Sequence, residues 1–173
     1  MSAYLITGEA GSGKTSIIHE LARRGYSTFN TDDMPDITRF YDLNTGQPTV
    51  TAPPAPIDFT RYAWNWDIPA LQKLLTQAPS PGFFGAITSN SNANFHLFKQ
   101  VFVLIPSLAN LKHPLQTRTA NDFGKHPDEL AGILKSFDQT GDYWRRNGAI
   151  VIDANPPVAI VADDILNRIR HDN

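Results

Sequence analysis

The sequence predicts an α/β protein with three layers, in which helices cover both faces of a five-stranded parallel sheet. Two observations predict it: short apolar runs alternate with amphipathic segments along the whole chain, and the apolar runs are rich in strand-forming residues. The expected strands are 4–7, 26–29, 83–88, 101–105 and 149–152. The expected helices are 16–24, 34–41, 67–77, 94–98, 107–117, 127–146 and 158–169.

The first elements are marked by their composition. Residues 4–7 form an apolar run that ends at Gly8, as expected of a buried strand. The segment 16–24 places three aliphatic residues on one side of a helix, and Gly25 follows where helices commonly end. A second strand, 26–29, follows this glycine directly.

A segment of different composition comes next. Residues 34–41 are expected to form a helix that Pro35 breaks early. Residues 43–58 are rich in proline, threonine and turn-forming residues, which is typical of a loop. We interpret about 43–66 as an insertion within a single domain of residues 1–173, because too little chain precedes it to fold independently.

Capping signals mark several of the later elements. Asp67 is expected to be the N-cap of a helix that carries Pro69 in its first turn. The apolar strand 101–105 ends at Pro106. Pro127 opens another helix, and two acidic residues follow it in the first turn, where they favour the helix dipole.

The composition of the chain indicates which partners and which cell compartment to expect. The 173 residues carry a formal net charge of −2, which argues against a dedicated nucleic-acid partner. The chain contains no cysteine, so it has no disulfide or zinc-thiolate site. It shows no signal peptide and no apolar stretch long enough to span a bilayer. We expect a cytoplasmic protein without a membrane partner, as a monomer or homodimer.

A glycine-rich motif follows the first strand. Its sequence, Gly8-Glu9-Ala10-Gly11-Ser12-Gly13-Lys14-Thr15, matches the phosphate-binding P-loop at every fixed position. Such a loop curls so that backbone N–H groups point at phosphate oxygens. Lys14 would reach the β- and γ-phosphates, and the Thr15 hydroxyl would ligate Mg²⁺. The sequence therefore predicts binding of ATP with Mg²⁺, with these candidate contacts: Gly8, Ala10, Gly11, Ser12, Gly13, Lys14, Thr15 and Ser16.

The chain resembles the small P-loop kinases of the shikimate kinase and adenylate kinase-like group. The resemblance rests on the P-loop at 8–15, on Phe29-Asn30-Thr31-Asp32 after the second strand, and on Arg39. It extends to an arginine-bearing segment at 118–125 and to a loop at 152–157. It implies a P-loop NTPase fold with a five-stranded parallel sheet, and transfer of a phosphoryl group from ATP to a small molecule.

The resemblance also implies roles for individual residues. Lys14, Asp32 and Arg118 would be catalytic, and Arg118 would contact the nucleotide from a lid at about 118–127. Asn155 and Pro156 would lie against the adenine.

The acidic residues depart from the family pattern. Asn30 stands where the family has the first of two aspartates, which shifts its role in holding Mg²⁺ to Asp32 or Asp33. The third strand also lacks an acid at its end, where Ser89 and Asn90 would contact substrate or a metal-bound water. The predicted metal ligands are Thr15 and Asp32.

The predicted substrate residues each have a structural alternative. Asp32 and Asp33 would either face the acceptor or cap a helix that follows them. Arg39 would bind an anionic group of the acceptor or form a surface ion pair. Arg118 would belong to a closing lid or to a solvated loop.

Two tryptophans follow the insertion. Trp64 and Trp66 would pack in the core, or they would form a stacking wall for the acceptor, with Trp66 as the predicted substrate residue. A stacking wall would favour a nucleoside-like acceptor.

Two functions remain open at this stage. The first is an ATP- and Mg²⁺-dependent kinase acting on a small-molecule acceptor, with a nucleoside or nucleotide as the leading class. The second is a nucleotide-dependent regulator or slow NTPase, which the missing acid of the third strand favours. A pocket beside the γ-phosphate, walled by Asp32, Arg39 and Trp66, would favour the kinase.

Overall fold

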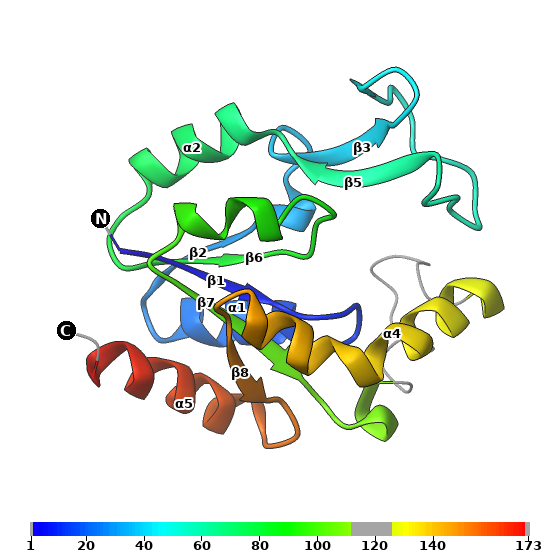
Figure 1. Cartoon of the computed structure of the whole chain (residues 1–173). Coiled ribbons are helices and arrows are strands. Elements are labelled where there is room, and N and C mark those ends of the chain that lie inside the picture. The colour runs from blue at the N-terminus through cyan, green and yellow to red at the C-terminus, as the bar shows by residue number, and fades with distance from the viewer. Residues whose placement is uncertain (1, 112–125, 172–173) are drawn as a thin grey trace.

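The computed structural model describes residues 2–111 and 126–171, and its centre is a parallel sheet (Figure 1). The strands are β1 (Ala3–Thr7), β2 (Ser27–Asn30), β6 (Gly82–Gly85), β7 (Gln100–Ile105) and β8 (Ile150–Asp153). Their order is β2-β6-β1-β7-β8, and every neighbouring pair is parallel. The predicted five-stranded parallel sheet is confirmed.

Helices cover both faces of this sheet, as predicted. Alternate residues of β1 point to opposite faces, so Leu5 and Ile6 belong to different cores. The Ile6 face packs against α1 (Lys14–Arg23) and α5 (Val158–His171). None of the helices within the described residues combines the length and apolar character needed to cross a membrane.

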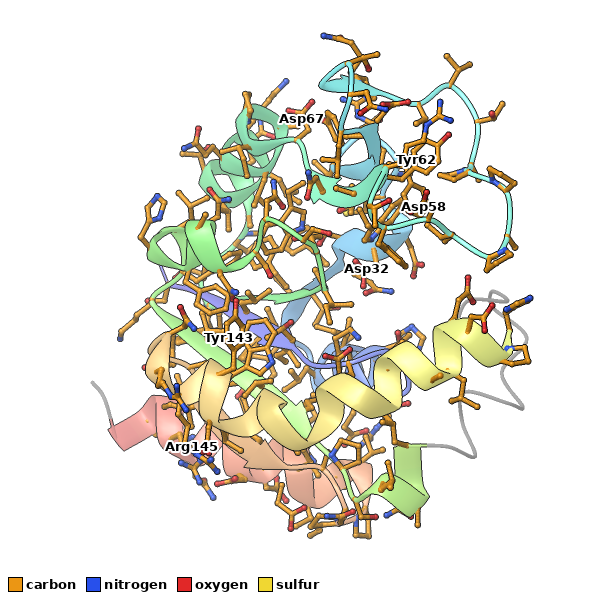
Figure 2. All side chains as sticks on the ribbon, turned by 45° about the vertical axis from the view of Figure 1, so that its right-hand side comes forward. Asp32, Asp58, Tyr62, Asp67, Tyr143 and Arg145 are labelled. Atoms are coloured by element: carbon orange, nitrogen blue, oxygen red, sulfur yellow. The ribbon has the colours of Figure 1, made fainter. Side chains whose placement is uncertain are left out.

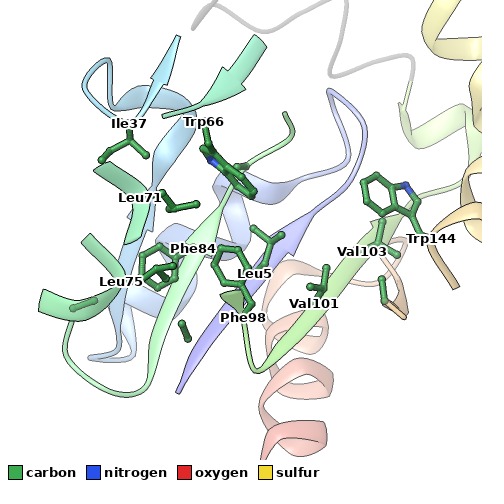
Figure 3. Packing of buried hydrophobic residues seen from close by; sticks show 14 residues of the cluster. Leu5, Ile37, Trp66, Leu71, Leu75, Phe84, Phe98, Val101, Val103 and Trp144 are labelled. Carbon is green, nitrogen blue, oxygen red and sulfur yellow. The ribbon is translucent and has the colours of Figure 1, made fainter. Parts of the chain in front are cut away.

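The Leu5 face carries the core that Figure 3 shows. Helix α2 (Ile68–Gln77) contributes Leu71 and Leu75, and α4 (Pro127–Arg146) contributes Trp144. These side chains pack against Phe84 of β6 and against the β7 valines. Both cores are thus built from the period-two pattern of the strands and the apolar stripes of the helices.

The insertion and the segment just before it form a second sheet that the sequence did not predict. Strands β3 (Thr38–Asp42), β4 (Gln47–Pro48) and β5 (Tyr62–Trp66) form it in the order β4-β3-β5, with antiparallel pairing. The helix expected at 34–41 is therefore wrong, and only the 3₁₀ turn η1 (Thr31–Asp33) precedes β3. Aromatic residues suit a strand, and pairing with β5 decides the conformation here. The short helix expected at 94–98 is the 3₁₀ segment η2 (Asn92–Leu97).

Buried hydrogen bonds fix the second sheet to the main sheet. The Trp66 Nε1–H donates to Thr31 Oγ1 at 3.0 Å, and the Thr31 hydroxyl donates to the Gly85 carbonyl at 3.2 Å. The Asn90 side chain also accepts from the Trp66 N–H and donates to the Trp66 carbonyl. The end of β5 is therefore held against the end of β6.

Asp67 caps α2 as predicted, and it also holds Arg39. Its Oδ1 accepts from the Ala70 N–H at 3.2 Å, and its Oδ2 lies 2.6 Å from Arg39 Nη2. We expect Asp67→Ala to lower the free energy of unfolding by about 1–2 kcal/mol, mainly through the lost cap. The ion pair is partly exposed and contributes less. Urea denaturation measures the change.

The matched variant Asp67→Asn keeps a capping side chain and removes the charge. We expect it to lose less than about half of the stability that Asp67→Ala loses. Equal losses in the two variants would show that the ion pair, and not the cap, stabilises this junction.

Candidate functional site

The P-loop has a backbone that only glycine adopts easily. Gly8, Gly11 and Gly13 have φ values of 144°, 86° and 96°. A Cβ on Gly8 would lie 2.6 Å from the carbonyl oxygen of Leu104 and 2.7 Å from Ser12 Oγ. The loop thus lies directly against the end of β7. Its first position must be glycine because a side chain there would clash with the β7 backbone.

Two side chains of the loop are placed for a phosphate. The buried Lys14 ammonium donates to the Gly8 carbonyl at 2.8 Å and to the Glu9 carbonyl at 3.3 Å, so it folds back over the loop. The buried Ser12 Oγ has no hydrogen-bond partner. An unpaired buried hydroxyl is costly, and a phosphate oxygen would satisfy it. The loop therefore fits the triphosphate that the motif predicts.

The remaining predicted nucleotide contacts lie around the start of α1. Thr15 and Ser16 follow Lys14 in the first turn of α1 and are exposed, which leaves both hydroxyls accessible at the positive end of the helix dipole. Ala10 packs against Leu111 and Ile133, so it supports the loop from the side of α4.

Asp32 lies where β2 and β6 end. Its carboxylate accepts from the Trp64 Nε1–H at 3.2 Å and from the Ile87 N–H at 3.2 Å, just beyond β6. Burial raises the pKa of Asp32, while the Lys14 ammonium and these two donors oppose the rise. Figure 2 shows Asp32 on the side of the second sheet that faces α4. A carboxylate from the segment after β2 thus stands at the end of β6, where the sequence lacks an acid.

A magnesium ion bound with the nucleotide, as the P-loop motif predicts, would be held mainly by phosphate and water. Magnesium commonly takes only one or two protein ligands and keeps several waters. Within the described residues, no group of three or more histidine or acidic side chains could hold a metal by itself. Thr15 and Asp32 remain the predicted ligands.

Asp33 differs from Asp32 in its surroundings. It is exposed, and its carboxylate accepts from the Asn30 side-chain amide. Because no helix follows at 34–41, the alternative role of these aspartates as caps of that helix is wrong.

The structure does not bring Arg39 to Asp32. Arg39 pairs with Asp67, and it lies on the face of β3 opposite to Phe40. Phe40 packs on Trp64 with the ring centroids 4.7 Å apart, and Trp64 contacts Asp32. Arg39 therefore points away from Asp32, and its ion pair matches the alternative stated above.

The two tryptophans have separate positions. Trp66 is only 2% exposed and packs against Phe98, so it is a core residue in this structure and not a wall of the site. Trp64 is half-buried and donates to Asp32, so it is the indole that borders the site. The two tryptophans lie on the same side of β5, and they differ in that Trp66 is buried more deeply than Trp64.

Ser89 and Asn90 join the loop after β6 to β5. The Ser89 N–H donates to the Trp64 carbonyl at 2.7 Å, while its side chain is exposed. The Asn90 amide makes two contacts with the Trp66 backbone, and its oxygen also accepts from the Thr88 hydroxyl at 3.0 Å. Asn90 thus has a structural role here, and the Ser89 hydroxyl remains accessible.

The structure describes the predicted adenine loop but leaves out most of the predicted lid. Asn155 Oδ1 accepts from the Ser107 N–H at 2.6 Å, which ties the loop after β8 to the segment after β7. Pro156 follows it in the same loop, at the strand ends where the P-loop also lies. Arg118 and most of the lid at 118–127 lie outside the described residues, so their role stays a prediction.

A cavity of about 290 Å³ lies beside the P-loop. Its lining comes from the P-loop, the insertion and the start of α4: Glu9, Pro56, Ile57, Phe59, Asp128, Glu129, Gly132 and Ile133. This cavity is not the pocket that would favour the kinase over the regulator, because Asp32, Arg39 and Trp66 do not line it. The Ile57 N–H donates to Glu129 Oε1 at 3.2 Å and joins two of its walls.

The lining residues were not predicted as site residues. Glu9 carried a usable signal, because it is the one acid within the P-loop motif. Burial raises its pKa, and the Lys14 ammonium opposes part of the rise. Residues 56–59 and 128–133 carry no local signal, since only the fold brings them together.

Solved structures match this architecture over nearly the whole chain, whereas no family model matches the sequence and no curated protein is a significant relative. A shikimate kinase from Acinetobacter baumannii, in complex with shikimate, matches with a TM-score of 0.63 and 15% identity over 100% of this chain and 95% of its own. The deoxyadenosine kinase of M. mycoides, with dCMP and dCDP, matches with a TM-score of 0.57 and 16% identity over 99% and 100%. A gluconokinase from Sinorhizobium meliloti 1021 matches with a TM-score of 0.56 and 16% identity over 99% and 94%. The chain has the fold of the small P-loop kinases.

Proposed function

We propose that the protein is an ATP- and Mg²⁺-dependent phosphotransferase that phosphorylates a hydroxyl group of a small molecule. The observation that carries the proposal is a partly buried carboxylate, Asp32, within the electrostatic reach of the P-loop lysine. A nucleotide-binding loop alone would serve a sensor equally well. A carboxylate beside it supplies a base or an orienting group for an acceptor hydroxyl.

The roles of the residues follow from their positions. The P-loop N–H groups, Ser12 Oγ and Lys14 would hold the β- and γ-phosphates, and Thr15 would ligate Mg²⁺, which neutralises phosphate charge when bound. Asp32 would accept the proton of the attacking hydroxyl as the new O–P bond forms and the bond to the β,γ-bridging oxygen breaks. Positioning and electrostatic stabilisation would supply most of the acceleration.

A nucleoside is the acceptor class that we favour within this proposal. The cavity next to the P-loop has an aromatic and aliphatic side, made by Phe59, Ile57 and Ile133, which suits a base or another flat ring. Its acidic residues suit a nucleotide less well, because a phosphate on the acceptor would meet carboxylates.

The test is ATP consumption with Mg²⁺ against a panel of nucleosides, nucleoside monophosphates, shikimate, gluconate and simple sugars. We expect at least one acceptor to raise turnover tenfold or more over water, and Lys14→Ala to abolish the gain. If ATP binds and no acceptor accelerates its loss, the protein is better described as a regulator or slow NTPase.

A further inference from the structure

Two indoles of β5 hold the turn that carries Asp32. Trp64 and Trp66 stand two residues apart on the same side of this strand. The Trp66 Nε1–H donates to the Thr31 hydroxyl at 3.0 Å. The Trp64 Nε1–H donates to the Asp32 carboxylate at 3.2 Å. Two successive positions on one face of β5 thus bind two consecutive side chains of η1.

The end of β6 holds the same two side chains from a second direction. The Thr31 hydroxyl donates to the Gly85 carbonyl at 3.2 Å. The Ile87 nitrogen, two residues further along, lies 3.2 Å from Oδ2 of Asp32 and 3.4 Å from Oδ1. The last torsion of an aspartate side chain is otherwise soft, and rotation about it would break the contact with the indole. The carboxylate therefore has a defined orientation.

The two halves of this arrangement differ in exposure. Thr31 is fully buried and Trp66 is 2% exposed, so their hydrogen bond belongs to the core. Asp32 and Trp64 are only half-buried, and Asp32 lies within the electrostatic reach of Lys14. A buried indole N–H needs a protein partner wherever it lies, whereas a half-buried one can bond to water. The hydrogen bond from Trp64 is therefore a feature of the site and not a requirement of the core.

The Trp64 ring is itself held in place. It packs on Phe40, its partner in the register of β3 and β5, with the ring centroids 4.7 Å apart. The Trp64 carbonyl also accepts from the Ser89 N–H at 2.7 Å. A donor that is fixed at both its ring and its backbone does not follow the carboxylate. It sets the position of the carboxylate instead, as the residues behind a reacting group commonly do.

We infer that Trp64 is a positioning residue for the phosphoryl transfer: its indole N–H holds Oδ1 of Asp32 and leaves Oδ2 to take the proton of the acceptor hydroxyl. This rests on the proposed function and adds a residue to it. Oδ1 receives the indole N–H and a share of the Ile87 N–H, whereas Oδ2 receives the Ile87 N–H. The oxygen with lone-pair capacity to spare is the one that serves as a base. Small displacements of such a group reduce the rate.

The first test is Trp64→Phe, which removes the N–H and keeps an aromatic ring against Phe40. With Mg²⁺, ATP and the acceptor that reacts best in the panel above, we expect kcat to fall at least fivefold. KM for ATP should change less than twofold, because the P-loop is not altered. A smaller loss in kcat would overturn the inference.

Trp66→Phe is the matched control, because it removes the same donor from the bond to Thr31. We expect it to lower the urea midpoint of unfolding more than Trp64→Phe does, since Trp66 lies in the core. Its kcat should stay within twofold of the wild type at a temperature where both variants are folded. Equal losses of kcat in the two variants would show that both indoles only support the fold, and would contradict the inference.

A double-mutant cycle shows whether Trp64 acts through Asp32. In the Asp32→Asn background, Trp64→Phe should change the residual kcat less than twofold, because the base that the indole positions is already gone. Two losses that multiply would mean that Trp64 acts on the reaction by another route, such as direct contact with the acceptor. That result would overturn the inference.

NMR separates this inference from the proposed function, because it needs no reaction. The Trp64 indole N–H signal, identified by its absence in Trp64→Phe, is recorded with Mg²⁺ and ADP. We expect it to move in Asp32→Asn and to stay in place in Asp36→Asn, where an exposed carboxylate is changed. A signal that ignores Asp32→Asn overturns the inference at any level of activity.

The two proposals then fail in different ways. If the signal responds to Asp32→Asn but no acceptor is phosphorylated, the contact between Trp64 and Asp32 stands and the kinase proposal fails. If an acceptor is phosphorylated and Trp64→Phe leaves kcat unchanged, the kinase proposal stands and the positioning role of Trp64 fails.

Discussion

Asp32→Asn is expected to lower kcat for the best acceptor by roughly 10²–10⁴-fold, the range for loss of a general base. The single amide oxygen can accept from the Trp64 Nε1–H at the Oδ1 position, which also lies 3.4 Å from the Ile87 nitrogen, so the contact with the indole is kept and the closer contact of Ile87 with Oδ2 is lost. Asn cannot take the hydroxyl proton. Steady-state kinetics with the wild-type acceptor measure the loss, and KM for ATP should change little.

The same change is expected to leave the protein at least as stable at neutral pH. Burial raises the pKa of Asp32 above its ordinary value of 3.8. Folding therefore takes up a proton between the ordinary and the raised value, and stability falls as the pH rises through that window. Above it, the ionised carboxylate costs free energy that Asn does not. Activity should show the opposite trend, since it is lost as the pH falls through the raised pKa.

Asp36→Asn is the control for both effects, because Asp36 is an exposed carboxylate four residues further along. We expect it to change kcat less than about threefold and stability by less than about 0.5 kcal/mol. If Asp32→Asn keeps a kcat within tenfold of the wild type, Asp32 is not the general base of the reaction. A clear loss of stability in that variant would instead assign the carboxylate a structural role.

Gly8→Ala is the second substitution with a large expected effect, and it lowers the stability of the folded protein. The new Cβ would lie 2.6 Å from the Leu104 carbonyl oxygen, with φ at 144°. We expect a loss of about 3 kcal/mol or more in the free energy of unfolding, because both overpacking and backbone strain contribute. Chemical denaturation measures it, and ATP binding should weaken with it.

Gly13→Ala separates the effect of a steric clash from the effect of backbone strain. Gly13 also has a positive φ, of 96°, but a Cβ there would meet no atom within 4 Å. Only backbone strain remains, so we expect a loss of about 1–2 kcal/mol. Similar losses for the two glycines would mean that the end of β7 gives way and that close packing does not restrict Gly8.

The main sheet and its helices could be predicted because their signals are local. Apolar runs, the Asp67 cap and the glycine after α1 lie within or next to the elements that they define. The second sheet could not be predicted, since the paired residues of β3 and β5 are 20 to 28 positions apart in the sequence. Its aromatic residues suit a strand but do not reveal their partner.

The candidate site likewise has parts that could be predicted from the sequence and parts that could not. The P-loop could be identified as one contiguous motif, and the segment after β2 could be identified as the source of the carboxylate. The direction of Arg39 could not, because it depends on which face of β3 meets the main sheet. The cavity could not either, since Glu9, residues 56–59 and α4 meet only in the folded chain.

The contact between Trp64 and Asp32 gives the protein an internal optical reporter. The chain has three tryptophans, of which Trp66 and Trp144 are 2% and 5% exposed, while Trp64 is half-buried. The emission of an indole responds to charge and polarity around its ring, and the Trp64 N–H touches the carboxylate that we assign to the reaction. Titration of Asp32 and arrival of an acceptor should therefore both be readable in the fluorescence of the unlabelled protein, with Trp64→Phe as the silent reference.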